Sequence, residues 1–236
     1  MSLAISARAG GRERFTFGSL TSTVFAIGVA LAAVFFLFPD IDLLFARMFY
    51  RPGVGFTGHA APAVSALQWF FIGFYYSCIA LALVGLVRAR VGRRSWLKLG
   101  MAQWLFVAAC LGVGPGLVAN VLLKPQVGRA RPKHVVEFGG TKAFTAPFVP
   151  ARECRQSCSF VSGEAASVVV PFYALALLIP QWSLPLAASG TVAGLVAGLI
   201  RISQGAHFLS DVIFALVFMA LAVLVVHRVM LGRAER

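Results

Sequence analysis

Three short segments of this sequence carry residues that could hold a phosphate group and attack it. They span residues 124–132, 159–164 and 201–211, and each lies at the edge of an apolar run. Cations at membrane depth are energetically costly, so they usually mark a functional site with an anionic partner. Here the cations accompany one histidine, His207, that has a carboxylate four residues later.

His207 and Asp211 would lie on one face of a helix, because residues four apart are neighbours there. A carboxylate bonded to one ring nitrogen fixes the tautomer and leaves the other nitrogen free to attack. An ordinary polar pair capping a helix would have the same spacing. Arg201, six residues before His207, offers a planar fork that matches phosphate oxygens, although an arginine at a span end can also simply reach toward water.

The other two segments supply further groups for a phosphate. Lys124 and Arg131 are joined by a path that prolines stiffen, so they could neutralise different oxygens of one phosphoryl group. Ser162 and Gly163 open an apolar run, where free backbone N–H groups form an oxyanion site. A solvated basic loop and a helix N-cap would explain these residues separately. Their order, spacing and common membrane side favour one phosphate site.

The composition predicts an integral membrane protein with a single domain, residues 1–236. Hydrophobic residues make up 59% of the chain and charged residues 12%, with a mean hydropathy of +0.85. A soluble domain of this size could not bury so much apolar surface. The net charge of +13 falls mainly between apolar runs, and no aromatic-interleaved basic tract indicates nucleic-acid binding.

The apolar runs predict an all-α polytopic protein with six transmembrane helices in one bundle. The fifth run is short and repeats a small residue every fourth position (Gly190, Gly194, Gly198), which we interpret as a packing face. The first run is too long for a signal peptide and is predicted to be retained. The predicted spans are residues 18–38, 66–87, 97–123, 162–179, 186–200 and 208–226.

Basic residues outside the spans predict the orientation. Both termini (1–17 and 227–236) and the 88–98 loop are expected in the cytoplasm of a bacterium with the protein in its inner membrane. The 39–65 and 124–161 loops and the 201–207 junction would then face outward. The cations of the 124–155 stretch violate the positive-inside trend, which indicates another role for them. The residues that set the orientation are Arg8, Arg12, Arg14, Arg88, Arg90, Arg93, Arg94, Lys98, Arg228, Arg233 and Arg236.

Two further features are left with open interpretations. Residues 41–50 are predicted to form either a short interfacial helix or a packed connector, with no chemistry assigned. Cys154 and Cys158 share an outer loop and could form a disulfide in an oxidising compartment, bind metal or be spaced by chance. We favour the disulfide and expect no metal site, because no second pair of ligands accompanies them.

At these positions the sequence resembles the membrane branch of the type 2 phosphatidic acid phosphatase superfamily. The three motifs of that family read K-x6-R-P, P-S-G-H and S-R-x5-H-x3-D. Lys124 to Pro132 match the first motif, and Arg201, His207 and Asp211 match the third, with Ile200 in place of its serine. The second motif is altered, because Glu164 stands where the family has histidine. The resemblance implies six helices, a site without metal or cofactor, and a phosphohistidine intermediate.

The resemblance also implies a role for each residue. His207 would be the nucleophile and Asp211 its orienting partner, while the phosphate would be held by Lys124, Arg131, Ser162, Gly163 and Arg201. Glu164 takes the place of the acid that protonates the leaving oxygen. Burial would be needed to make a glutamate acidic near neutral pH, whereas neighbouring cations favour its carboxylate form. A first-turn residue that stabilises the helix dipole is the structural alternative.

The sequence therefore predicts an outward-facing lipid phosphatase whose substrate is a phosphorylated membrane lipid. The altered second motif favours a lipid A-type glycolipid, and prenyl pyrophosphate or phosphatidate-type lipids are also compatible. Two alternatives are a lipid phosphotransferase that uses the same intermediate and a catalytically impaired lipid-phosphate binder. The sequence predicts no particular oligomeric state.

Overall fold

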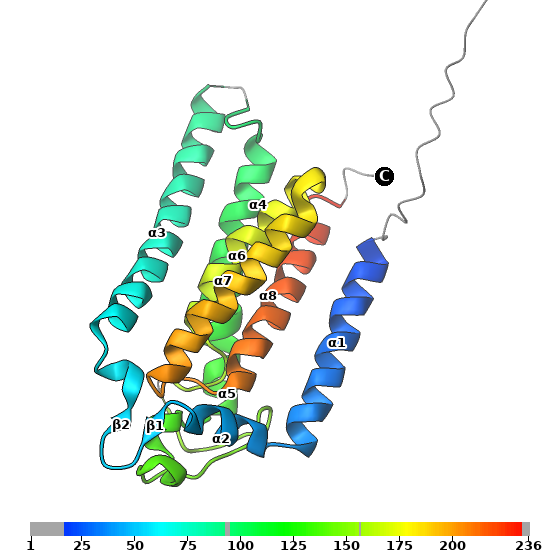
Figure 1. Ribbon diagram of the computed structural model, residues 1–236. Helices are drawn as coiled ribbons and strands as arrows, with labels where there is room; N and C mark the ends of the chain where they lie inside the picture. The colour runs from blue at the N-terminus through cyan, green and yellow to red at the C-terminus, as the bar shows by residue number, and fades with distance from the viewer. Residues whose placement is uncertain (1–16, 93–94, 156, 233–236) are drawn as a thin grey trace, which may run out of the picture.

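The computed structural model describes residues 17–92, 95–155 and 157–232. Nearly all of the predicted N-terminal segment and the end of the predicted tail lie outside these ranges, together with Arg8, Arg12, Arg14, Arg93, Arg94, Arg233 and Arg236. Within them the chain forms a bundle of long helices that run roughly side by side (Figure 1). The long helices are α1 (Phe17–Leu37), α3 (Pro62–Val91), α4 (Met101–Leu111) continued by the π-helix η2 (Gly112–Leu123), α6 (Gly163–Leu178), α7 (Ser183–Ser203) and α8 (Leu209–Met230).

Short elements gather at one end of the bundle (Figure 1). One antiparallel hairpin pairs Tyr50 with Phe56 and is an addition to the predicted all-α fold. The short elements at this end are α2 (Asp40–Arg47), β1 (Tyr50–Arg51), β2 (Gly55–Phe56), η1 (Thr57–His59), α5 (Lys124–Val127), η3 (Pro132–His134) and η4 (Val136–Phe138). The turn η5 (Pro180–Trp182) lies between α6 and α7.

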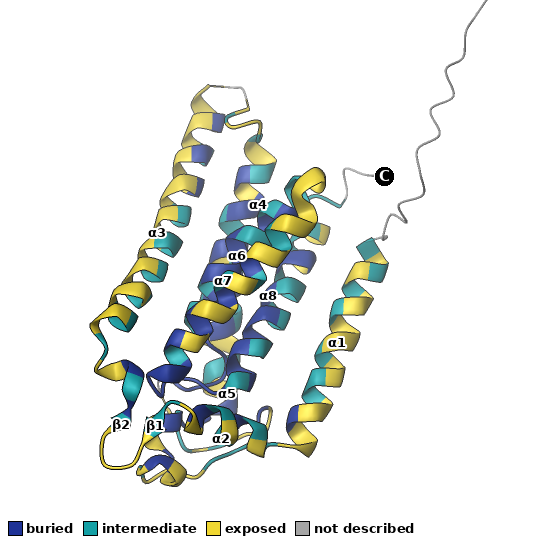
Figure 2. Ribbon diagram, in the orientation of Figure 1, coloured by how far each residue is buried: buried dark blue, intermediate teal, exposed yellow. Residues whose placement is uncertain are grey.

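The predicted helical membrane fold is confirmed. Five helical segments of the described chain are long and apolar enough to cross a membrane, and the 16-residue α6 is a shorter apolar helix. Figure 2 shows that α6 is largely buried in the bundle, whereas α1 and α3 expose much of their surface. The expectation of a short fifth span is wrong, because α7 extends over 21 residues.

The glycine face of α7 packs against two neighbouring helices, as its spacing predicts. A Cβ atom at Gly190 would lie 2.4 Å from the Phe172 side chain of α6. A Cβ atom at Gly198 would lie 2.2 Å from Val212 of α8, one residue after Asp211. These glycines therefore let α7 approach the helices that begin at the site.

Pro115 explains the irregular third span. A proline inside a helix donates no backbone hydrogen bond, which leaves a carbonyl of the preceding turn without its usual donor. The Tyr75 hydroxyl donates to the carbonyl of Leu111 at 2.8 Å, and the Asn120 side chain donates to the carbonyl of Pro115 at 2.7 Å. The span continues as η2 and delivers Lys124 to the end of the bundle.

The start of α1 and the end of α8 lie at one end of the bundle, together with the end of α3 and the start of α4 (Figure 1). The segment between α5 and α6 and the α7–α8 junction lie at the opposite end. This arrangement puts the three segments with predicted phosphate-binding residues at the same end of the bundle.

Candidate active site

His207 lies in the short connection between α7 and α8, and its side chain is 1% exposed. Its Nδ1 atom lies 2.7 Å from the backbone carbonyl oxygen of Ser159. Because a carbonyl can only accept, the proton of the neutral ring belongs on Nδ1. The Nε2 atom then carries the free lone pair, and it has no hydrogen-bond partner among the described residues. This arrangement would allow Nε2 to act as a nucleophile.

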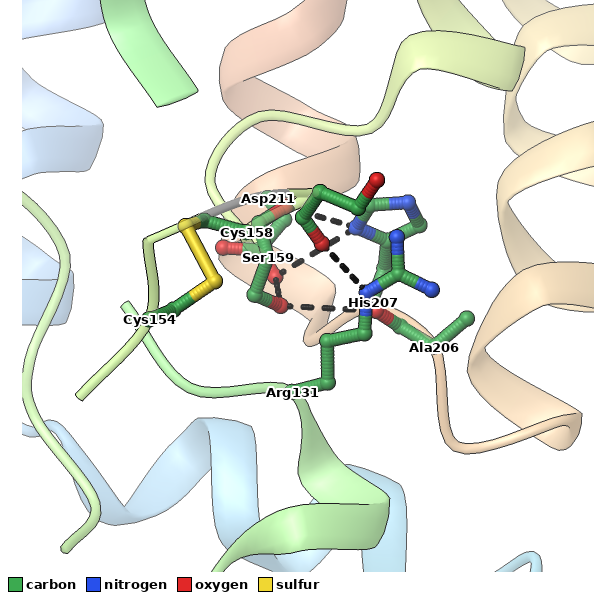
Figure 3. The surroundings of a disulfide bond; sticks show 8 residues. Arg131, Cys154, Cys158, Ser159, Ala206, His207 and Asp211 are labelled. Atoms are coloured by element: carbon green, nitrogen blue, oxygen red, sulfur yellow. Dashed lines mark hydrogen bonds and ion pairs between the residues drawn. A yellow bond between two sulfur atoms is a disulfide. The ribbon is translucent and has the colours of Figure 1, made fainter. Parts of the chain in front are cut away.

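Asp211 forms hydrogen bonds with residues next to the imidazole and lies farther from the imidazole itself. Its Oδ2 atom is 3.8 Å from Nδ1 of His207, but it accepts hydrogen bonds from the Ser159 hydroxyl and from the amide of Phe208 at 2.7 Å. The direct partner of His207 is thus a carbonyl that Asp211 helps to position. Figure 3 shows Ser159 between the disulfide segment and His207.

Glu164 links the second and third motifs. Its carboxylate forms an ion pair with Arg201 at 2.9 Å, and its other oxygen lies 3.5 Å from Nε2 of His207. Arg201 also donates to the side chain of Gln204, and Gln204 donates to Gln68 of α3 at 3.0 Å. The ion pair favours the charged form of Glu164, which therefore faces the nucleophile as a carboxylate.

Lys124 and Arg131 are held by neutral acceptors. The ammonium group of Lys124 donates to Asn120 at 2.7 Å, and Nε of Arg131 donates to the Ser157 carbonyl at 2.7 Å. A Cβ atom at Gly163 would lie 3.2 Å from Nζ of Lys124, so a glycine lets the lysine approach the start of α6. These contacts fix the two side chains while leaving their positive charges without a carboxylate partner at ion-pair distance among the described residues.

Ser162 is the N-cap of α6 and is fully buried. Its hydroxyl accepts from the amide of Ala165 at 3.4 Å, and its own amide donates to the carbonyl of Asp211 at 3.0 Å. The cap therefore ties the start of α6 to the first turn of α8. The start of a helix is also where backbone N–H groups can bind an anion.

A cavity of about 340 Å³ lies beside Lys124, between residues of α3, η2 and α6. Its polar end contains Lys124, Gly163 and Glu164, and its apolar side includes Tyr75 and Tyr76 of α3. The cavity thus combines a charged end with an aromatic wall, which suits an amphipathic ligand.

Cys154 and Cys158 form a disulfide, with their Cα atoms 5.5 Å apart. The bonded Cys158 directly precedes Ser159, whose carbonyl accepts from His207 (Figure 3). In the part of the chain that the structure describes, no cluster of His, Cys, Asp and Glu could hold a metal ion.

Several residues of the site could not be identified from the sequence. The Ser159 carbonyl has no side-chain signature, and Gln68 comes from a distant helix. Arg129 is fully buried although it lies in a segment that reads as a basic loop. Asp42 is fully buried too, in the segment to which no chemistry was assigned. That segment contains the short helix α2, which buries Asp42 and Ala46.

The chain matches the PAP2 superfamily over residues 103–235. It is 37% identical over 210 residues to a lipid A 4′-phosphatase of Francisella tularensis subsp. novicida, covering 86% of this chain and 93% of that protein. A lipid A 4′-phosphatase of Rhizobium leguminosarum is 35% identical over 78% of this chain and 84% of its own length. A lipid A 1-phosphatase of Rhizobium etli is 38% identical over 44% of this chain and 40% of its own length.

Proposed function

Because the chain belongs to the PAP2 superfamily, we propose that it is a lipid A phosphatase that removes the 4′-phosphate through a phosphohistidine on His207. The observation that carries the proposal is the free Nε2 atom of a buried histidine whose opposite ring nitrogen is fixed by a carbonyl. Three relatives that are similar over most of the chain are lipid A 4′-phosphatases, which supports this position over the 1-phosphate.

In the first step Nε2 of His207 attacks phosphorus, and the bond between phosphorus and the sugar oxygen breaks. Lys124, Arg131 and Arg201, with the Gly163 amide at the start of α6, hold the phosphoryl oxygens and offset their charge. Ser162 caps the helix, and its own amide is bonded to the carbonyl of Asp211. The departing sugar oxygen takes its proton from the phosphate or from water, because Glu164 is held as a carboxylate by Arg201.

In the second step water attacks the phosphohistidine and the N–P bond breaks. Glu164 lies 3.5 Å from the nitrogen that carries the phosphoryl group. A carboxylate at this distance can accept the proton of the attacking water. Glu164 thus serves as a base and as a support for Arg201, in place of the general-acid role that the family motif implies.

We further propose that the site faces the periplasm from the inner membrane, with both termini in the cytoplasm. The support is the basic character of the opposite end, where Arg88, Arg90 and Lys98 flank the turn between α3 and α4. Arg90→Cys and Val136→Cys, at exposed positions on opposite ends, test it by labelling in intact cells. Only Val136→Cys should react with a membrane-impermeant thiol reagent, and the opposite pattern would reverse the orientation.

The substrate is tested with the purified protein in detergent and without added metal. Bis-phosphorylated lipid A should lose one phosphate, and mass-spectrometric fragmentation should place the loss on the 4′ position. Lipid A that lacks only the 1-phosphate should react, whereas lipid A that lacks only the 4′-phosphate should not. Turnover of prenyl pyrophosphate or phosphatidate without turnover of lipid A would overturn the proposed substrate.

The same assay separates the other activities considered for this site. Free inorganic phosphate as the product is the expected result for a hydrolase. Transfer of labelled phosphate to an added lipid would make the protein a phosphotransferase. Binding of lipid A with no turnover of any lipid tested would make it a lipid-phosphate binder.

A further inference from the structure

Three charged side chains near His207 are fully buried: Asp42, Arg129 and Asp211. Asp42 and Arg129 have no part in the chemistry described above. Arg129 forms an ion pair with Asp42 at 2.8 Å and another with Asp211 at 2.7 Å. All three side chains have 0% exposure. The guanidinium group therefore connects α2 to the first turn of α8, whose carboxylate supports the nucleophile.

The surroundings of this cluster fix its geometry. Nε of Arg129 donates to the carbonyl of Thr145 at 2.8 Å, and Nη1 donates to the Ser210 hydroxyl at 2.9 Å. The guanidinium also lies 4.3 Å from the centre of the Phe208 ring, where a cation is attracted to the aromatic face. Phe208 directly follows His207, so the cluster is packed against the connection that carries the nucleophile.

The hydrogen bonds that Asp42 accepts match its carboxylate form. It accepts from the Ser210 amide at 2.8 Å, from the Ser210 hydroxyl and from Arg129. The pKa of Asp42 is raised above its ordinary value by burial and by the nearby charge of Asp211, while the charge of Arg129 and the donated hydrogen bonds oppose that shift. With three donors aimed at two oxygens, the ionised form is the one that the surroundings match.

The charges of the cluster do not cancel. Two carboxylates share one guanidinium, and among the described residues neither carboxylate has another lysine or arginine within ion-pair distance. The cluster therefore carries one net negative charge next to an imidazole that becomes positive when its Nε2 atom bonds to phosphorus. Without Asp42, Arg129 would cancel the charge of Asp211. Such charges act strongly here because water does not screen them.

We propose that Asp42 is a positioning residue for His207: by offsetting the charge of Arg129, it leaves Asp211 able to stabilise the positively charged imidazole of the reaction. Asp42 touches no substrate and acts through Arg129 and Asp211. This inference deepens the proposed function and rests on it, because it requires His207 to be the nucleophile.

The test compares three variants of the full-length protein in detergent. Asp42→Asn removes the offsetting charge and takes the cluster from one negative charge to none. Asp40→Asn is the matched control, since Asp40 is an exposed acidic residue in the same first turn of α2. The double variant Asp42→Asn with Arg129→Gln removes one negative and one positive charge. The cluster then keeps one net negative charge, that of Asp211, as in the parent.

The first measurement gives kcat and KM for an aryl phosphate. The value of kcat is calculated per enzyme molecule that can be trapped as the phosphoenzyme. Asp42→Asn should lower kcat by about 10-fold or more and change KM by less than about 3-fold, because the affected charge develops only during the reaction. Asp40→Asn should match the parent. The double variant should recover kcat relative to Asp42→Asn, whereas a merely structural role predicts that it is the worst of the three.

The second measurement is the acid limb of kcat/KM against pH. The limb rises as the imidazole loses its proton, and a lost negative charge makes that proton leave at lower pH. Asp42→Asn should therefore move the limb toward lower pH by about 1 unit, the effect of a charge roughly 10 Å away at an effective dielectric constant of about 20. Glu164 of α6, Arg201 of α7 and Asp211 of α8 also face His207, and all three are unchanged in these variants.

Each result decides the proposal. An unmoved acid limb with an unchanged kcat per site in Asp42→Asn would overturn it, even if that variant is less stable. If Asp42→Asn does not fold, the double variant must fold and keep the acid limb of the parent, or the proposal is wrong. Turnover of the aryl phosphate without turnover of lipid A rejects the proposed substrate alone, and failure of His207→Ala to abolish turnover rejects both inferences.

Discussion

Two groups of charged side chains meet at His207, and they differ in their access to solvent. Asp42, Arg129 and Asp211 have no exposed side-chain surface and form ion pairs with one another. Arg201 and Glu164 are paired as well, but they keep 14% and 25% of their side-chain surface exposed. The buried group has no room for a new partner, whereas the exposed group can exchange its contacts for those of a phosphate. The difference separates the residues that prepare the nucleophile from those that receive the substrate.

The largest effect should come from the residue that both groups contact. His207→Ala should abolish turnover of lipid and aryl phosphates, because no other imidazole lies at this position. The variant should still unfold at a temperature close to that of the parent in detergent. Vanadate should inhibit the parent, and EDTA should not. Substantial phosphate release by the variant would falsify the phosphohistidine mechanism.

A further cation proposed to hold the phosphate, Arg131, should matter next. Arg131→Gln should lower kcat/KM by about 10²–10³-fold, the usual loss when one donor to a transition-state oxyanion is removed. Lys133→Gln is the matched control, because Lys133 is an exposed cation two residues away. Steady-state kinetics of both variants on the same lipid would compare them. Equal losses would mean that general basic charge, rather than the position of Arg131, attracts the substrate.

Glu164 lies where the two groups come closest. Glu164→Gln should lower turnover by about 10²-fold, because the neutral amide neither balances Arg201 nor accepts a proton from water. The loss should be similar for lipid A and for an aryl phosphate, since neither role depends on the leaving group. A much smaller loss with the aryl phosphate would restore Glu164 as the general acid for the leaving oxygen.

The disulfide should have the smallest effect. Reduction, or the double variant Cys154→Ser with Cys158→Ser, should lower kcat by about 2–5-fold, because Ser159 follows Cys158 and holds His207 through its carbonyl. Cys78→Ser, at a free cysteine in α3, is the control for the loss of a thiol. A kcat unchanged by reduction, with only the unfolding temperature lowered, would limit the disulfide to stability.

Motifs with charged side chains made the candidate phosphate-binding and attacking residues predictable. Lys124, Arg131, Arg201 and His207 were identified from the spacing of their segments, and the predicted family and phosphatase class are confirmed. All six predicted spans overlap helices of the structure, with ends that differ by up to four residues, because a bilayer requires long apolar runs. The sequence also placed Glu164 at the nucleophile, although its pairing with Arg201 required the structure.

The buried group was not predictable for a physical reason. Asp42 and Arg129 are 87 positions apart, and only the folded chain brings them together. In the sequence Asp42 looks like an ordinary first-turn acid of a short helix, as Asp40 does. Arg129 looks like one more cation of a solvated loop. A tertiary ion pair leaves no periodic pattern, so neither residue could be distinguished from its exposed neighbours.

The order in which the pieces of the site follow one another along the chain affects how the protein is made. Asp42 is synthesised first, then Lys124 to Arg131, then Ser159 to Glu164, and the nucleophile only just before the last helix. A nascent chain that stops before residue 207 has most of the phosphate-binding groups but lacks the imidazole proposed as the nucleophile. Activity therefore requires translation past residue 211, and a chain that stops earlier is inert toward the phosphates that it meets.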